Sequence, residues 1–168
     1  MRLFVGLCPS PEFRSALAEM QEYLRNAGIT GRYLEPSNLH MTLAFIGEWP
    51  EDVTELLPEV SCPFSVTLAH PGVFPRAKVL WAGVEKCEAL DSLAALVRQR
   101  LSEADVPFDP QAFAPHITLA RKPLIPEGLD LSALPVPHAE MEVREVCLYR
   151  SEHGLNGMEY TVIGRSGR

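Results

Sequence analysis

Two short segments of this 168-residue chain repeat the same residues, and these residues could carry out acid–base chemistry. The first segment reads LHMTLAFIGEW and the second reads PHITLAR. His40 and Thr42 in the first match His116 and Thr118 in the second, at an offset of 76 residues. A single histidine of this kind usually has a structural role. Two copies in matching context favour a shared chemical role instead.

Both segments are short and rich in β-branched or bulky apolar residues, which is typical of strands. Side chains at i and i+2 of a strand share a face, so each strand presents a histidine and a threonine together, backed by apolar residues. Histidine titrates near neutrality, so His40 and His116 can supply one general base and one general acid. Hydroxyl groups from Thr42 and Thr118 can donate hydrogen bonds to an anionic phosphoryl group attacked in line.

Two cations follow the second motif, Arg121 and Lys122. Arg121 lies five residues after His116, so a straight strand would point it away from the histidine face. It can reach a phosphate only if the strand ends or bends near Ala120, or if its side chain wraps round. Lys122 is expected at the surface. Four aromatic residues lie near the motifs, and one of them could stack on a base, although most are expected in the core: Phe4, Phe45, Trp49 and Trp81.

Other chemistries fit the sequence less well. The motifs supply two histidines without an adjacent acidic residue or cysteine, whereas zinc usually takes three or four protein ligands, so we expect no metal site. The chain contains no G-x-S-x-G segment to support a serine nucleophile. Its four cysteines form no C-x-x-C pair and are expected to be reduced. The remaining histidines, His70, His138 and His153, have no repeated partner and are expected at the surface.

Composition indicates an ordinary globular protein, with 46% apolar and 22% charged residues. No apolar run approaches the ~18 residues of a membrane span, so we expect no membrane association and a cytoplasmic location. The net charge of −7 argues against a broad nucleic-acid-binding surface but is compatible with a small anionic substrate in a local basic pocket.

The N-terminal half reads as strand 2–7, then a helix capped by Ser10 with Pro11 in its first position. The apolar face of this helix is Phe13, Leu17, Met20 and Leu24, and Gly28 is a plausible left-handed C-terminal cap. After the first histidine strand we expect a helix of about two turns over PEDVTELLPEV, a strand over 63–69, and a loop from His70 to Lys78 that crosses between two halves.

The same plan then repeats, with a strand at 79–85, a helix from about 89 to 104 and the second histidine strand. The apolar face of this helix is Leu90, Leu93, Ala94, Val97 and Leu101. A proline-rich loop, a strand at 141–150 and a hairpin strand at 159–164 complete the chain. This pattern predicts a single domain over 1–168, with pseudo-repeats of about 1–70 and 78–150. We expect an α+β fold with antiparallel-rich sheets around a central groove and helices outside.

The paired His-x-Thr-Leu motifs resemble those of the 2H phosphoesterase superfamily. Together with MRLFVGL, RAKVLWAGV and LYRSEHGLNGMEYTV, they resemble the RNA 2′,3′-cyclic phosphodiesterases, also called 2′-5′ RNA ligases (LigT or ThpR). The resemblance implies a duplicated bilobal fold and hydrolysis of a 2′,3′-cyclic phosphate to a 2′-phosphate without a metal or other cofactor. It implies catalysis by His40 and His116, and phosphate binding by Thr42, Thr118 and Arg121. Guided by it, we expect His116 to be the base and His40 the acid.

Three alternatives remain open. The same groove could serve a 2′-5′ RNA ligase, a phosphodiesterase of 2′-5′ oligonucleotides, or a module that binds nucleotides or RNA ends without turnover. The expected partners are RNA termini or nucleotides with a 2′,3′-cyclic phosphate, and we expect the protein to act as a monomer. The sequence does not specify the RNA or the preferred base.

Overall fold

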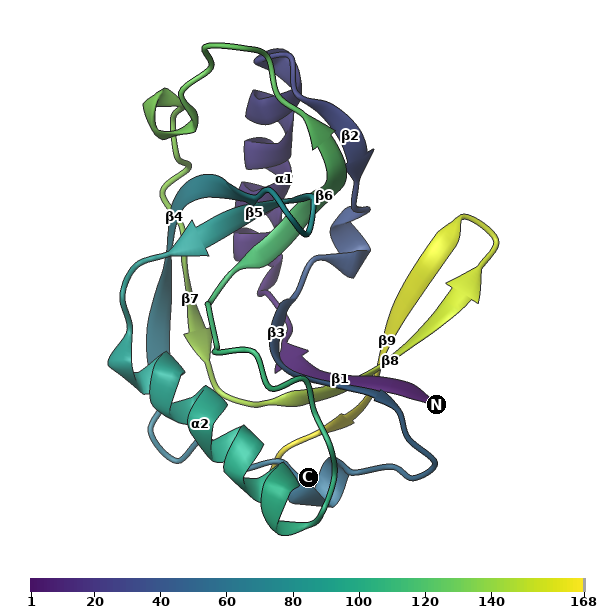
Figure 1. Ribbon diagram of the computed structural model, residues 1–168. Coiled ribbons are helices and arrows are strands. Elements are labelled where there is room, and N and C mark those ends of the chain that lie inside the picture. Colours follow the sequence, from purple (N-terminus) through teal and green to yellow (C-terminus); the bar gives the residue numbers. More distant parts are fainter. Residues whose placement is uncertain (168) are drawn as a thin grey trace.

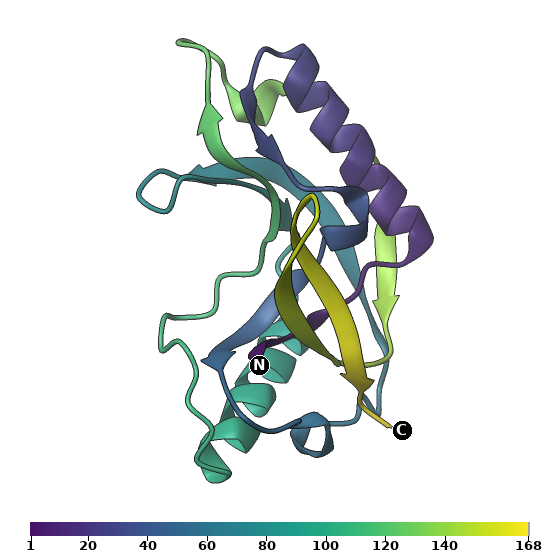
Figure 2. The same ribbon diagram turned by 90° about the vertical axis from the view of Figure 1, so that its right-hand side faces the viewer.

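The computed structural model describes residues 1–167, and in this range nine antiparallel strands form one curled sheet with two α-helices (Figures 1 and 2). This is an α+β fold, as expected, and the sheet is curled into a half-barrel. The elements are β1 (Arg2–Leu7), α1 (Pro11–Asn26), β2 (Thr30–Tyr33), β3 (Met41–Glu48), β4 (Phe64–Phe74), β5 (Val79–Val84), α2 (Glu88–Glu103), β6 (Ile117–Leu124), β7 (Glu140–Val143), β8 (Cys147–Gly154) and β9 (Gly157–Arg165).

The strands follow the order β7-β4-β5-β6-β3-β1-β8-β9, and β2 pairs with β6 beside this path. The link between β6 and β3 is narrow, because the pairing there is Met41 with Ile117. We call the strands on the two sides of this link the β6 half-sheet (β7, β4, β5, β6, β2) and the β3 half-sheet (β3, β1, β8, β9). The two expected sheets are therefore continuous through one pair of residues.

Helix α1 begins and ends where the sequence predicts. The Ser10 hydroxyl accepts a hydrogen bond from the backbone N–H of Phe13 at 3.2 Å, and Pro11 occupies the first turn. Gly28 follows the last turn with a φ of 94°, a conformation that costs glycine little. The predicted apolar face is buried, and the neighbouring Gln21 is buried with it.

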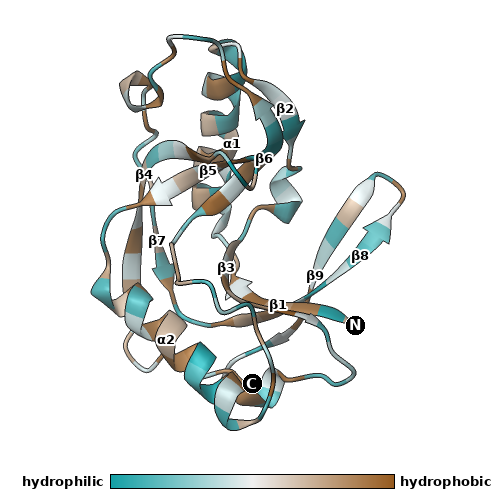
Figure 3. Ribbon diagram, in the orientation of Figure 1, coloured by the Kyte–Doolittle hydropathy of each residue, from teal (hydrophilic) through white to brown (hydrophobic). Residues whose placement is uncertain are grey.

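The two helices are exchanged between the half-sheets. Helix α1 follows β1 in the chain, but it lies against the β6 half-sheet, where it bonds to the backbone of Leu119. Helix α2 follows β5, but it packs on β3 and bonds to the backbone of Leu43. Its predicted apolar face is buried. Figure 1 shows the helices at opposite ends of the molecule, and Figure 3 shows how hydrophobic β1 is along most of its length.

The expected two-turn helix over PEDVTELLPEV is wrong, because the structure has only a 3₁₀ turn at Thr54–Leu56 there. Two local features oppose an α-helix. The Asp52 carboxylate accepts bonds from the Thr54 N–H and hydroxyl, which favours a turn. Pro58 lacks an N–H and disfavours the helical conformation in Leu57, which is extended here.

The prediction of a loop from His70 to Lys78 is also wrong. Strand β4 continues through Phe74 and forms a hairpin with β5, so only the segment 75–78 turns. The strand tolerates Pro71 because the register shifts between Leu68 and Pro71, and a proline is accommodated at such an irregularity.

The strand expected at 141–150 is split in two. Glu140–Val143 forms β7 and pairs with β4, whereas Cys147–Gly154 forms β8 and pairs with β1. The chain thus passes from one half-sheet to the other between these strands. The expected pairing of the last strand as a hairpin is confirmed, since β9 pairs with β8 along its length.

Candidate active site

The two His-x-Thr motifs meet at the link between the half-sheets. His40 directly precedes β3, and His116 directly precedes β6. Because these strands are antiparallel and Met41 pairs with Ile117, extending the register by one residue places His40 opposite Thr118 and Thr42 opposite His116. All four side chains then lie on the face opposite to the paired residues. The repeated motifs are therefore brought together around one point.

A β-bulge follows each motif and changes which face the next side chains occupy. On β6, Thr118 and Ala120 pair with consecutive residues of β5, so Leu119 is the extra residue. Such a bulge resets the alternation, and consistently both Leu119 and Ala120 are fully buried. Arg121 therefore returns to the face of Thr118 and lines a cavity together with His40. The objection that a straight strand would point Arg121 away is thus resolved by the bulge.

The equivalent bulge on β3 places Phe45 on the cavity face. Thr42 and Ala44 pair with consecutive residues of β1, so Leu43 is the extra residue. Phe45 is partly exposed and lines the same cavity as Arg121. Of the aromatics considered from sequence, Phe45 is thus available for contact with a ligand, whereas Phe4 is buried at 3% exposure.

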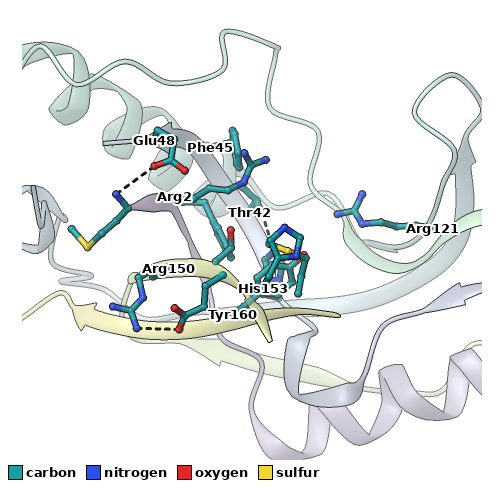
Figure 4. A pocket seen from close by; sticks show the side chains of 14 residues that line it. Arg2, Thr42, Phe45, Glu48, Arg121, Arg150, His153 and Tyr160 are labelled. Atoms are coloured by element: carbon teal, nitrogen blue, oxygen red, sulfur yellow. Dashed lines mark hydrogen bonds and ion pairs between the residues drawn. The ribbon is translucent and has the colours of Figure 1, made fainter. Parts of the chain in front are cut away.

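The cavity beside His40 has a volume of about 910 Å³, and Figure 4 shows Arg121 reaching into it from the side opposite to Arg150. Fourteen residues line it: Met1, Arg2, Phe4, His40, Thr42, Phe45, Glu48, Arg121, Arg150, Ser151, Glu152, His153, Met158 and Tyr160. Its volume is of the size that holds small ligands in proteins. Three of the predicted site residues, His40, Thr42 and Arg121, line it.

The ring of His40 is fixed on both nitrogens. Its Nδ1–H donates to the carbonyl of Asn38 at 2.7 Å, since a carbonyl can only accept. Its Nε2 lies 3.1 Å from the Thr42 hydroxyl and can accept from it in the neutral ring. Phe4 and Tyr160 pack against the ring, with centroids 4.6 and 5.0 Å away. The motif therefore presents Nε2 and the hydroxyl together.

Burial lowers the pKa of His40 from 6.5 to about 4. The hydrogen bond to the Asn38 carbonyl opposes this shift, while the positive charges of Arg121, His116 and Arg14 add to it. His40 is therefore neutral near pH 7 in the free protein.

His116 has a matching arrangement. Its Nδ1–H donates to the carbonyl of Ala114 at 2.6 Å, two residues before it, as His40 does with Asn38. The ring of Phe74 stands edge-on to it at 5.0 Å. In both rings Nδ1 is bound to a backbone carbonyl, so Nε2 is the nitrogen that can exchange a proton with a ligand. The bond of His116 to Ala114 is exposed, whereas that of His40 to Asn38 is partly buried. Neither His116 nor Thr118 lines the cavity described above.

The cations of the site differ in how they are held. Within residues 1–167 no carboxylate pairs with Arg121, whereas Arg150 pairs with Glu152 at 3.1 Å. Arg2 lies over the Phe45 ring at 4.9 Å. Lys122 is exposed and does not line the cavity, as expected. Arg121 is therefore the cation best placed to attract an anion beside His40.

Sequence reasoning missed the contribution of the β8–β9 hairpin. Tyr149 and Tyr160 pack on Phe4 and His40. His153 is exposed, as expected, and it also lines the cavity. The alternating pattern identified the hairpin, but nothing local in it indicates that it folds over β1. No group of three or more His, Cys, Asp or Glu side chains arranged to hold a metal ion occurs in the described part of the chain.

The curled α+β sheet and its two facing His-x-Thr strands define a phosphoesterase of the two-histidine class. Residues 9–155 match the family model described as the 2′-5′ RNA ligase superfamily. The chain therefore belongs to that superfamily, within its LigT family of RNA 2′,3′-cyclic phosphodiesterases, which are hydrolases.

Similar proteins are found both by sequence and by structure. An RNA 2′,3′-cyclic phosphodiesterase of Thermus thermophilus is 33% identical over 97% of this chain and 88% of its own length, and one of Thermotoga maritima is 29% identical over 97% and 93%. The crystal structure of Escherichia coli LigT in apo form superposes with a TM-score of 0.82 at 27% identity, covering 98% of this chain and 95% of LigT. LigT has also been crystallised with 3′-AMP.

No helix in residues 1–167 has the length and apolar character needed to span a membrane.

Proposed function

We propose that this protein hydrolyses 2′,3′-cyclic phosphates at RNA ends or on nucleotides to 2′-phosphates, using His40 and His116 as an acid–base pair without a metal. The observation that carries the proposal is the meeting of two His-x-Thr motifs at one seam, each ring with Nδ1 bound to a carbonyl and Nε2 kept for chemistry. The names of the relatives support the substrate class, and LigT with 3′-AMP supports nucleotide binding.

In this mechanism a water molecule attacks phosphorus opposite the leaving oxygen. The base takes a proton from the water as the new P–O bond forms, and the acid gives a proton to the 3′-oxygen as the old P–O bond breaks. Thr42, Thr118 and Arg121 bind the non-bridging oxygens and stabilise their charge. We place His116 as the base and His40 as the acid, so the phosphate remains on the 2′-oxygen.

The environment of His40 adds a requirement to this assignment. His40 is neutral in the free protein, because burial and nearby cations lower its pKa to about 4. A bound phosphate brings negative charge beside Arg121 and His40 and therefore raises this pKa. Substrate binding is thus coupled to proton uptake by His40, which prepares it as the acid.

NMR titration of the histidine rings tests this coupling. In the free protein, the Nε2 of His40 should remain unprotonated down to a midpoint of about pH 4. Addition of a 2′-nucleotide product should move that midpoint upward, because the anion favours the charged ring. A free-protein midpoint near the ordinary 6.5 would contradict the burial argument, and an unchanged midpoint with nucleotide bound would contradict the coupling.

Incubation with 2′,3′-cyclic AMP in the presence of EDTA tests the function itself. Turnover should persist, because the proposed acid–base pair needs no metal, and phosphorus NMR should identify 2′-AMP as the main product. Loss of turnover on chelation that zinc or manganese restores would overturn the metal-free mechanism. A predominant 3′-phosphate product would mean that the cyclic phosphate binds between the histidines in the opposite orientation. Binding without turnover would favour a non-catalytic module.

We infer further that the chain is a single domain built by duplication, with pseudo-repeats of about 1–70 and 78–150. The equivalent bulges after Thr42 and Thr118 support this inference, as do the matching Nδ1 bonds. We expect the protein to act as a monomer in the cytoplasm, where its four free cysteines would remain reduced.

A further inference from the structure

Two helix side chains, Gln21 on α1 and Arg98 on α2, occupy equivalent positions in the two halves of the chain. They are 77 residues apart, close to the offset of 76 between His40 and His116. Neither lines the cavity beside His40. Their hydrogen bonds follow one pattern, which gives them a shared role.

Gln21 is buried, with 2% exposure, and uses one amide nitrogen for two bonds. Its Nε2 donates to the carbonyl of Leu34 and to the carbonyl of Leu119, both at 3.0 Å. Leu34 lies in the segment that leads to His40, and Leu119 is the bulge residue that follows Thr118. One side chain therefore connects the approach to the first motif with the strand of the second.

Arg98 makes the equivalent bonds with the roles of the two motifs exchanged. Its Nε donates to the carbonyl of Leu43 at 3.1 Å, and its Nη1 donates to the carbonyl of Gln111 at 2.7 Å. Leu43 is the bulge residue that follows Thr42, and Gln111 lies in the segment that leads to His116. In both halves the near carbonyl lies 13 residues after the helix residue.

We propose that Gln21 and Arg98 are paired positioning residues that hold the two His-x-Thr motifs at their working separation. The half-sheets meet through one pair of residues, so the seam alone is a weak constraint on their relative placement. Each bulge carbonyl lies directly after the threonine of its motif, so fixing that carbonyl fixes the adjacent threonine and histidine. Gln21 joins the strand of the second motif to the segment that leads into the first, and Arg98 joins the strand of the first motif to the segment that leads into the second. Together the two side chains constrain how each motif lies relative to the other.

A purely structural role is the competing explanation, because buried carbonyls need donors wherever they occur. The two explanations differ in what a substitution changes. The Leu119 carbonyl also accepts a bond from the Leu34 N–H at 2.9 Å, so it keeps a donor when Gln21 is replaced. A structural role then predicts a loss of stability alone, whereas positioning predicts a slower reaction in protein that is still folded.

Kinetics of the variants Gln21→Met and Arg98→Met form the first arm of the test, and this arm rests on the proposed function. Methionine keeps an unbranched side chain and removes the donors. We expect kcat for 2′,3′-cyclic AMP to fall about 10-fold or more, with KM changed less than about two-fold, because misplaced groups lose rate more than binding. Gln99→Met is the matched control, since Gln99 is exposed on α2 and its side chain bonds to Glu103.

Rescue by Arg98→Gln makes the test specific. Glutamine serves at the equivalent position 21, so it should restore most of the rate that Arg98→Met loses. An Arg98→Gln variant as slow as Arg98→Met would overturn the equivalence of the two positions. Met variants that melt at lower temperature but keep the wild-type kcat below that temperature would overturn the positioning role.

NMR titration of His40 without substrate forms the second arm and does not depend on the proposed function. Burial is the largest cause of the lowered His40 pKa, and the positive charges of Arg121, His116 and Arg14 add to it. If the Met variants let the motifs separate, the His40 midpoint should rise above about 4, because the charges of Arg121 and His116 move away. An unchanged midpoint in folded Gln21→Met protein would overturn the proposal, even if the wild type hydrolysed no cyclic nucleotide.

Discussion

Replacing either His40 or His116 with alanine should lower kcat for a 2′,3′-cyclic nucleotide by ~10²-fold or more, which is the scale of general acid–base catalysis. One ring is needed for the attacking water and the other for the leaving oxygen, so each loss disables one end of the displacement. The double variant should be little worse than either single variant, because the pair works as a unit. Steady-state kinetics with saturating substrate measure this directly.

Two controls make this result interpretable. His138→Ala removes an exposed histidine that does not line the cavity and should leave kcat unchanged. His40 packs against Phe4 and Tyr160, so His40→Gln is a second variant that fills more of the space if alanine disturbs the fold. Near wild-type activity in either folded histidine variant would remove that residue from the proposed mechanism.

Loss of the Arg121 guanidinium should have the next largest effect. Arg121→Ala should lower kcat/KM by about 10- to 100-fold, the equivalent of a charge-assisted hydrogen bond of about 1.5–3 kcal/mol. Arg121 lines the cavity with His40 and has no carboxylate partner in residues 1–167, so its charge is available to a phosphate. Kinetics at low and high salt should show that the Arg121→Ala variant depends less on salt than the wild type.

Lys122→Ala is the matched control for this cation, because Lys122 is the next residue, is exposed and does not line the cavity. It should change kcat/KM by less than about two-fold, as exposed charges contribute little. The loss of kcat/KM in Thr42→Val and in Thr118→Val should lie between the losses in Lys122→Ala and Arg121→Ala, since each removes one neutral hydroxyl. A Lys122 variant more impaired than the Arg121 variant would show that the wrong cation has been assigned to the phosphate.

Features set by neighbouring residues were predictable from the sequence. Ser10 and Pro11 mark the start of α1, and the spacing from Phe13 to Leu24 marks its buried face, because both signals act within a few residues. The duplicated His-x-Thr pattern likewise identified the residues that the fold brings together, since a repeat can be recognised without knowing the path of the chain between its copies.

Features that depend on distant pairing were not predictable. The bulge at Leu119 exists only relative to the register of β5, so the direction of Arg121 could not be read from the spacing alone. Tyr160 reaches His40 because Asn38 bonds to the backbone of β9, with Nδ2 donating to the Met158 carbonyl at 2.8 Å, across 120 residues of sequence. The exchange of α1 and α2 could not be predicted from local sequence either, because an apolar helix face does not specify which sheet covers it.

The exchange of helices bears on how such a molecule could have originated. If the chain descends from a half-length ancestor, a lone copy would have left the apolar face of its helix without the sheet that covers it here. That ancestor would have needed a symmetric dimer, each copy lending its helix to the other and both sharing one active site. Fusion through the short β4–β5 turn would join the copies and keep each helix on the sheet of the other. Two copies in a homodimer must have the same sequence, whereas two halves of a fused chain can diverge. Gln21 and Arg98 differ in this way at equivalent positions, as do Phe45 and Arg121.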